Sequence, residues 1–258
     1  MILGLSLASP LWGQSIREGL SQDKPAAATE AKGEISQEAW DYVAGNLLTT
    51  FYHELGHALI DQLDLPVLGR EEDAADSLSV VLTEKIWLEE WAQIYVSAQA
   101  VNYLLSADEA EVDEIAIADV HSLDLQRYYG HICLFYGANP EARAKWLQDF
   151  DLPEGRAENC PFEYEQAARS WQRFLDPLEE KAPGKALRFE ADPADSISIL
   201  IAQEVDDLNE LFALPKAVDV RLQDCGEVNA FYDPQISEIT LCTEYVDWLW
   251  QQAGDLDL

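Results

Sequence analysis

The residues best suited to chemistry lie in the stretch Phe51-Tyr-His-Glu-Leu-Gly-His57. His53 and His57 are four positions apart, so on a helix both imidazoles share one face and can bind a single Zn²⁺ ion. Glu54 directly follows the first histidine and is a candidate general base toward a water molecule. The alternative is a pair of histidines that only pack in the core or lie on the surface. The spacing, inside a strongly periodic segment, favours a metal site with one zinc per chain.

A candidate third ligand follows the helix-breaking residues 66–69. Glu72 and Asp76 are again four positions apart, and Ala74 and Ala75 between them allow another helix to approach closely. Two histidines with one glutamate are a standard ligand set for catalytic zinc, so we expect Glu72 to be the third ligand. Asp76, one turn later, would accept the N–H of a ligand imidazole and fix its tautomer.

Glu71 competes with Glu72 for the role of third ligand. An acidic first turn that favours the helix dipole would explain both glutamates without a metal. It would not explain the Glu-x-x-Ala-Asp spacing, which therefore favours Glu72.

Hydrolysis of a carbonyl compound at such a site needs a second electrophile beside the metal, to stabilise the oxyanion. His121 is the first candidate, because it lies in a predicted turn and not on an apolar helix face. Arg127, Tyr128 and Tyr129 are alternatives, and a surface or turn-capping role explains His121 equally well. His131 is predicted to be a packed helix residue.

The elements that must position these residues are mainly helices. Ser36 is a predicted N-cap, and the apolar periodicity of the histidine-bearing helix runs from there to about residue 63. Further helices are predicted over 70–105, 108–119, 124–137, 141–149, 161–180 and 197–213. Alternation predicts strands over 186–191 and 217–222 and a hairpin that joins 229–232 to 238–242. The expected fold class is α+β and mostly helical.

The domain organisation follows from changes in composition along the chain. Residues 1–34 are predicted to be a leader and linker, and residues 35–182 a helical catalytic body with the zinc site. Residues 183–258 are predicted to form an α/β segment with a hairpin, packed on the same domain.

The composition excludes several classes of function. The 258 residues include 16 Lys+Arg and 49 Asp+Glu, which give a formal net charge of −33. This charge repels phosphate backbones and anionic lipids, so binding to nucleic acid or to a membrane surface is not expected. No window has the roughly 20 apolar residues that a membrane-spanning helix needs. With 48% hydrophobic residues and 8 Trp, the chain can form a substantial core.

Four cysteines fall into two pairs that are close in sequence, Cys133 with Cys160 and Cys225 with Cys242. Two disulfides paired in this way fit an oxidising compartment, whereas four buried free thiols in the cytosol are the alternative. Residues 1–13 are apolar and resemble the end of a truncated secretory signal, although an apolar strand or leader also fits them. These features predict an exported protein.

Longer stretches carry a resemblance to known proteins. HELGH followed by Glu-x-x-Ala-Asp resembles the gluzincin type of zinc metallopeptidase. HELGHALIDQLDLPVLGREEDAAD, DVHSLDLQRYYGHICLFYGANPE, CPFEY, CGEVNAFYDP and LCTEY are similar to an uncharacterised bacterial family of metallopeptidases, over about 40–180 and 205–250. The resemblance implies a zincin-like core, zinc ligands His53, His57 and Glu72, Glu54 as base, the disulfides paired as above, and export to the periplasm or the medium.

One feature departs from that pattern. Zincins have an edge strand upstream of the histidine-bearing helix, where it lines the substrate cleft. In the family that the chain resembles, the Cys-Gly-x-x-Asn-Ala-Phe-Tyr hairpin often precedes that helix, whereas here it lies at 225–232. We therefore expect either that the C-terminal hairpin folds back to supply the strand, or that part of the N-terminal lobe lies outside this chain.

The function predicted from the sequence is a zinc-dependent metallopeptidase that acts on a peptide or protein substrate. A non-catalytic binding protein with a structural metal site is the first alternative, and a zinc amidase acting on non-protein material is the second. The presence of Glu54 favours catalysis, because a structural site needs no base at that position.

Overall fold

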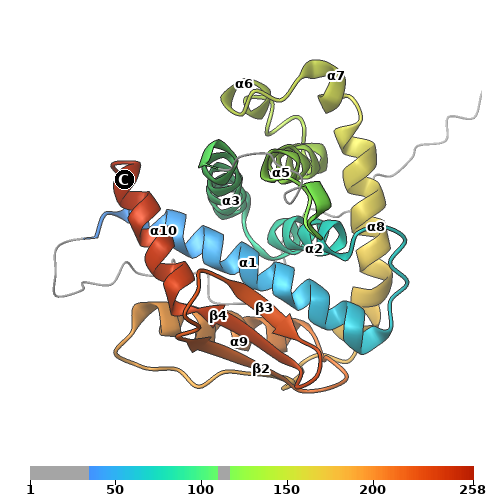
Figure 1. The fold of residues 1–258 in the computed structure, drawn as a ribbon. Helices are drawn as coiled ribbons and strands as arrows, with labels where there is room; N and C mark the ends of the chain where they lie inside the picture. Colours follow the sequence, from blue (N-terminus) through green and yellow to red (C-terminus); the bar gives the residue numbers. More distant parts are fainter. Residues whose placement is uncertain (1–34, 110–116) are drawn as a thin grey trace, which may run out of the picture.

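The fold is mostly helical with one small mixed sheet, as expected for the α+β class (Figure 1). The structure, a computed structural model, describes residues 35–109 and 117–258. The helices of this part are α1 (Gln37–Leu63), α2 (Glu71–Ile86), α3 (Glu89–Glu109), α5 (Asp124–Ala138), α6 (Trp146–Asp149), α7 (Glu154–Ala157), α8 (Cys160–Glu179), α9 (Ser196–Leu211) and α10 (Thr243–Asp255). The strands are β1 (Leu187–Arg188), β2 (Val218–Gln223), β3 (Ala230–Asp233) and β4 (Glu238–Cys242). None of the described helices is long and apolar enough to cross a bilayer.

α1 is the central helix of the fold. Its predicted N-cap is present, because the Ser36 side-chain oxygen accepts the backbone N–H of Ala39 at 3.0 Å. The helix is buried on nearly all sides by α2, α3, α10 and the two strands of the hairpin (Figure 1). Gly45 lets α3 approach closely, since a Cβ at this position would lie 3.0 Å from the Tyr95 Cα atom. The two histidines therefore lie on a helix that its neighbours pack against on nearly all sides.

The sheet places the C-terminal hairpin against α1. Its strand order is β1-β2-β4-β3, with β1, β2 and β4 parallel and β3 antiparallel to β4 at one edge. β3 contacts α1, and the Tyr232 hydroxyl donates a 2.8 Å hydrogen bond to Asp61 of that helix. The hairpin therefore folds back onto the helix that carries the histidines.

The predicted helix over 70–105 is in fact two helices, α2 and α3, so this expectation was wrong. The chain turns at Trp87, whose backbone is extended (φ −95°, ψ 148°). The Trp87 ring is buried and its indole N–H donates to the Tyr52 hydroxyl at 2.8 Å. Glu89 and Glu90 then begin α3, where acidic residues favour the helix dipole. Burial of the tryptophan at the corner overrides the continuous helical periodicity.

Two other predicted elements are shorter than expected. Within 141–149 only α6 is helical, and the turn before it brings the Arg143 side chain into the interior, where it pairs with Glu84 and Glu89. The strand expected over 186–191 is reduced to β1, which pairs with β2 alone. α7 was not predicted, and most of the helix expected over 108–119 lies outside the described residues.

Both expected disulfides are present. Cys133 and Cys160 join α5 to α8, and Cys225 and Cys242 join the loop that follows β2 to the end of β4. Cys133 and Cys160 are fully buried. Of the described residues, no cysteine is free. The alternative of four free thiols does not apply to this structure.

Replacing Cys133 and Cys160 together with alanine should lower the free energy of unfolding by about 3–4 kcal/mol, because the bond closes a long loop in the unfolded chain. The sequence separation is 27 residues. Urea denaturation of the double variant and of the wild type measures the difference. An unfolding free energy equal to that of the wild type would contradict a structural role for this bond.

Candidate metal centre

The site lies where α1 and α2 pack closely. A Cβ atom at Gly56 would lie 3.0 Å from the Cα atom and 3.2 Å from the Cβ atom of Ala75. The small residues at both positions let the helix backbones approach, as the Ala-Ala pair in the sequence predicted. As a result, the acidic first turn of α2 lies beside His53 and His57.

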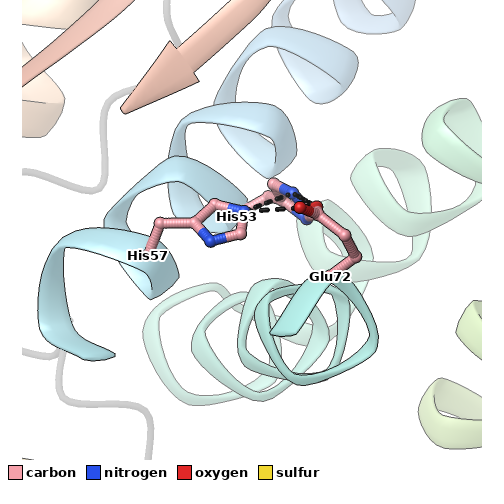
Figure 2. Close-up of side chains that lie close together, drawn as sticks. All are labelled: His53, His57 and Glu72. Carbon is pink, nitrogen blue, oxygen red and sulfur yellow. Dashed lines mark hydrogen bonds and ion pairs between the residues drawn. The ribbon is translucent and has the colours of Figure 1, made fainter. Parts of the chain in front are cut away.

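Three donor atoms converge between the two helices. Figure 2 shows His53 and His57 of α1 and Glu72 of α2 pointing toward one another. The Glu72 Oε2 atom lies 3.1 Å from His53 Nε2 and 3.2 Å from His57 Nε2. The two Nε2 atoms are 3.1 Å apart. The structure thus brings together the three residues that the sequence proposed as ligands.

Carboxylates hold the outer nitrogen of each of these imidazoles. His53 Nδ1 lies 2.8 Å from Asp76 Oδ1, the contact expected from the spacing of α2. His57 Nδ1 lies 2.8 Å from Glu71 Oε1. Glu71, the competing candidate for ligation, therefore faces the far side of a ligand ring, while Glu72 faces the cluster. With N–H at Nδ1 donated to a carboxylate, each neutral ring directs its Nε2 lone pair inward.

The donor set fits a zinc ion. In this tautomer two nitrogen lone pairs and one carboxylate oxygen face one another at 3.1–3.2 Å, an arrangement that repels itself unless a cation or protons lie among them. Two imidazoles and one carboxylate are a ligand set that Zn²⁺ takes in catalytic sites. Without a metal ion, burial lowers the pKa of His53, but hydrogen bonds with Asp76 and Glu72 outweigh the effect of burial. The net result is a pKa raised to about 9. A metal that binds here must displace protons.

Glu54 is buried beside the cluster, with only 6% of its surface exposed. Burial raises the pKa of its carboxyl above the usual value, although the nearby charges of His53 and His57 oppose this shift. Partial burial also favours a higher pKa for Glu72, but hydrogen bonds from the imidazoles outweigh it and hold that pKa well below its usual value. Two carboxyls on facing helices, Glu54 of α1 and Glu72 of α2, thus differ: the first holds a proton readily and the second stays ionised.

His121 reaches the same glutamate from another segment. Its Nε2 atom lies 3.0 Å from Glu72 Oε2, and its Nδ1 atom lies 3.0 Å from Asp119 Oδ1. It does not belong to the group of ligand atoms that all lie within 4.8 Å of one another. Nearly half of its side chain is exposed, so it borders the cluster on the solvent side.

The segment around His121 is fastened to the start of α2. The Arg70 guanidinium donates to the His121 carbonyl oxygen. The Ser122 hydroxyl donates to Asp73 Oδ1 at 2.7 Å. Together with the contact between His121 and Glu72, these bonds join the segment to three residues at the start of α2.

The three alternatives to His121 as the oxyanion-stabilising residue bond to groups other than Glu72. The Arg127 guanidinium binds both oxygens of Asp76. The Tyr128 hydroxyl donates to the Phe150 carbonyl oxygen, and the Tyr129 ring packs on the Tyr128 ring. None of these three has a contact with Glu72 among the hydrogen bonds and ion pairs of the described residues. His121 is therefore the best placed of the four candidates.

His131 is packed in the interior, as predicted, with 3% of its surface exposed. Its Nε2 atom lies 3.2 Å from the Ser79 hydroxyl and its ring packs on Tyr103. Burial lowers the pKa of this imidazole. It therefore remains neutral at neutral pH and takes no part in the cluster.

Sequence reasoning missed two contacts of the site, Glu71 with His57 and Arg127 with Asp76. The contact of Glu71 with His57 had a signal in the sequence, because two adjacent glutamates at the start of a helix can face the two different nitrogen atoms of one imidazole. The second had none, since Arg127 lies 51 positions from its partner on a separate helix.

The comparison with families agrees with this geometry. A family described as putative metallopeptidase has a model that matches residues 18–175 and 196–255, which is more than half of the chain. The chain therefore belongs to this family. Comparison with curated proteins and comparison with solved structures gave no match.

Gly56→Ala should weaken zinc binding and lower stability. Overpacking against the Ala75 backbone costs about 1–3 kcal/mol, which exceeds the gain of about 1 kcal/mol from removing a helical glycine. Gly130→Ala in α5 is the matched control, because no atom lies within 4 Å of a Cβ built there. It should raise stability and leave zinc affinity unchanged. Urea denaturation and a chelator competition measure both, and equal behaviour of the two variants would contradict the close contact.

Proposed function

We propose that the protein is a zinc-dependent metallopeptidase. The observation that carries this proposal is the convergence of His53 Nε2, His57 Nε2 and Glu72 Oε2, with Glu54 buried on the same turn of α1. When bound there, zinc supplies Lewis-acid chemistry, which polarises a carbonyl group and makes water more acidic. Membership of a metallopeptidase family supports the same conclusion.

The number of ligands favours catalysis over a structural clamp. Structural zinc sites are closed by four protein ligands, whereas catalytic sites take three and leave a position for water or substrate. The group that could hold the ion has three members, and His121 lies outside it although it touches Glu72. A purely structural site would also have no use for the buried carboxyl of Glu54.

Two side chains are assigned to the chemistry. Glu54 takes the proton of the attacking water and later delivers it to the leaving amine, a task that suits its raised pKa. His121 donates an N–H to the oxygen of the scissile carbonyl as negative charge develops there. Its exposed position on the rim of the cluster leaves room for a substrate to reach it.

The edge strand β3 is proposed to bind the substrate backbone, as in a zincin-like core. It lies at the end of the described sheet, so one side of it has no strand partner there. Tyr232 of this strand bonds to Asp61, which lies one helical turn after His57. An extended peptide can add to such an edge through backbone hydrogen bonds, which places it along the metal-bearing helix. A zinc amidase remains the second candidate, and cleavage of peptides distinguishes the two.

The protein is proposed to work outside the cytoplasm. Two disulfides, one of them buried between α5 and α8, are typical of oxidising compartments. Fractionation of a bacterium that expresses the natural gene tests this: recovery outside the cytoplasm supports export, and recovery in the cytoplasm contradicts it.

Glu54→Gln should retain zinc and lose peptide hydrolysis by a factor of about 10²–10⁴, because the amide cannot take a proton. Cleavage of a peptide library, followed by mass spectrometry on zinc-loaded proteins, provides the measurement. Hydrolysis by Glu54→Gln at the wild-type rate would contradict the assignment of the base. A zinc-loaded wild type that cleaves no peptide would contradict the peptidase.

His121→Asn should lower kcat by a factor of about 10²–10³, with the zinc content unchanged, because a donor to the oxyanion is removed or displaced. Steady-state kinetics on one cleaved peptide separate kcat from KM. Loss of zinc with the substitution would instead show that His121 is a ligand. An unchanged kcat would remove it from the mechanism.

A further inference from the structure

Arg127 of α5 is bound to the carboxylate behind the first ligand histidine. Its Nε atom donates to Asp76 Oδ2 at 2.8 Å and one terminal nitrogen donates to Asp76 Oδ1 at 2.7 Å. The same Oδ1 atom lies 2.8 Å from His53 Nδ1. Both members of the ion pair are largely buried, with 15% and 11% of their side chains exposed. One oxygen thus links the guanidinium to the imidazole.

α3 completes this arrangement. The Arg127 guanidinium carbon lies 4.4 Å from the centre of the Tyr103 ring, and the Tyr103 hydroxyl donates to Asp76 Oδ1 at 3.4 Å. A planar guanidinium can stack on a ring and donate two parallel bonds at once, whereas an ammonium group cannot. The position therefore uses properties specific to arginine.

The buried carboxylate needs this partner to stay where it is. An ionised carboxylate taken out of water is strongly unfavourable unless it is paired and hydrogen-bonded. The neutral imidazole N–H of a metal-bound His53 would supply one hydrogen bond and no charge. Arg127 supplies the charge and two bonds, one to each oxygen, which fix the plane of the carboxylate as well as its place.

We propose that Arg127 is a positioning residue of the metal centre: it holds Asp76 so that Oδ1 accepts the Nδ1–H of His53, and thereby aims His53 Nε2 at the ion. This inference rests on the proposed zinc site. Because Arg127 belongs to α5, the inference adds this helix to α1 and α2 as a part of the centre. The segment that carries His121 leads directly into α5.

A second buried arginine provides a matched control. Arg143 is 1% exposed, pairs with Glu84 and Glu89, and stacks on the Phe135 ring. It has the same chemistry as Arg127 but no contact with the metal cluster among its hydrogen bonds. Loss of Arg127 leaves the buried Asp76 carboxylate without its cation, and loss of Arg143 leaves the half-buried Glu84 and Glu89 without theirs, so both losses should destabilise the fold.

The test compares Arg127→Met with Arg143→Met by competition for Zn²⁺ with a chromophoric chelator. Loss of the partner that bonds directly to a metal-bound histidine typically lowers metal affinity 10- to 100-fold, and Arg127→Met acts through such a partner, Asp76, so we expect a loss of about 10-fold. Arg143→Met should bind zinc within about twofold of the wild type, although its melting temperature falls. Cobalt substitution gives a second readout, because its visible d–d spectrum should change in Arg127→Met and not in Arg143→Met.

Arg127→Lys keeps the experiment decisive if Arg127→Met does not fold. Lysine retains the charge but cannot bind both oxygens of Asp76, so its zinc affinity should be lower than that of the wild type. Wild-type affinity in folded Arg127→Lys or Arg127→Met would overturn the proposal. The measurement does not use hydrolysis, so it stands if no peptide is cleaved. A wild type that binds no zinc would instead refute the proposed function, and this inference with it.

Discussion

The proposed metal centre depends on the close contact between α1 and α2 at Gly56 and Ala75. The helix backbones can approach only because neither position has a side chain larger than a methyl group. At this separation Glu72 reaches both imidazoles, while Glu71 and Asp76 reach their outer nitrogens. A wider crossing would break all of these contacts together, because the first two turns of α2 supply them.

The charges of the centre are balanced in layers around the two imidazoles. Glu72 lies on the inner side, Asp76 and Glu71 on the outer side, and Arg127 behind Asp76. Bound zinc would bring the positive charge that the inner layer lacks. This local balance contrasts with the formal net charge of −33 of the whole chain. The cluster is thus a specific arrangement of charges and not a sample of the acidic surface.

The sequence was sufficient for the parts of the site that lie within one helix. The spacing of His53 and His57 and of Glu72 and Asp76 follows from helical geometry alone, and the structure brings these pairs together. Contacts between segments that are distant in the chain could not be predicted from the sequence. The pairing of Arg127 with Asp76 depends on how α5 packs, and the break at Trp87 depends on a buried ring that helical periodicity does not reveal. The position of β3 beside α1 was open in the sequence for the same reason.

Elemental analysis of the purified chain tests the central claim most directly, with His57→Ala beside it. Removal of one imidazole leaves His53 and Glu72, which are too few protein ligands for a stable zinc site. We predict one zinc per wild-type chain and a large loss of zinc in the variant. Absence of stoichiometric metal from the wild type, even after zinc is added back, would contradict the account.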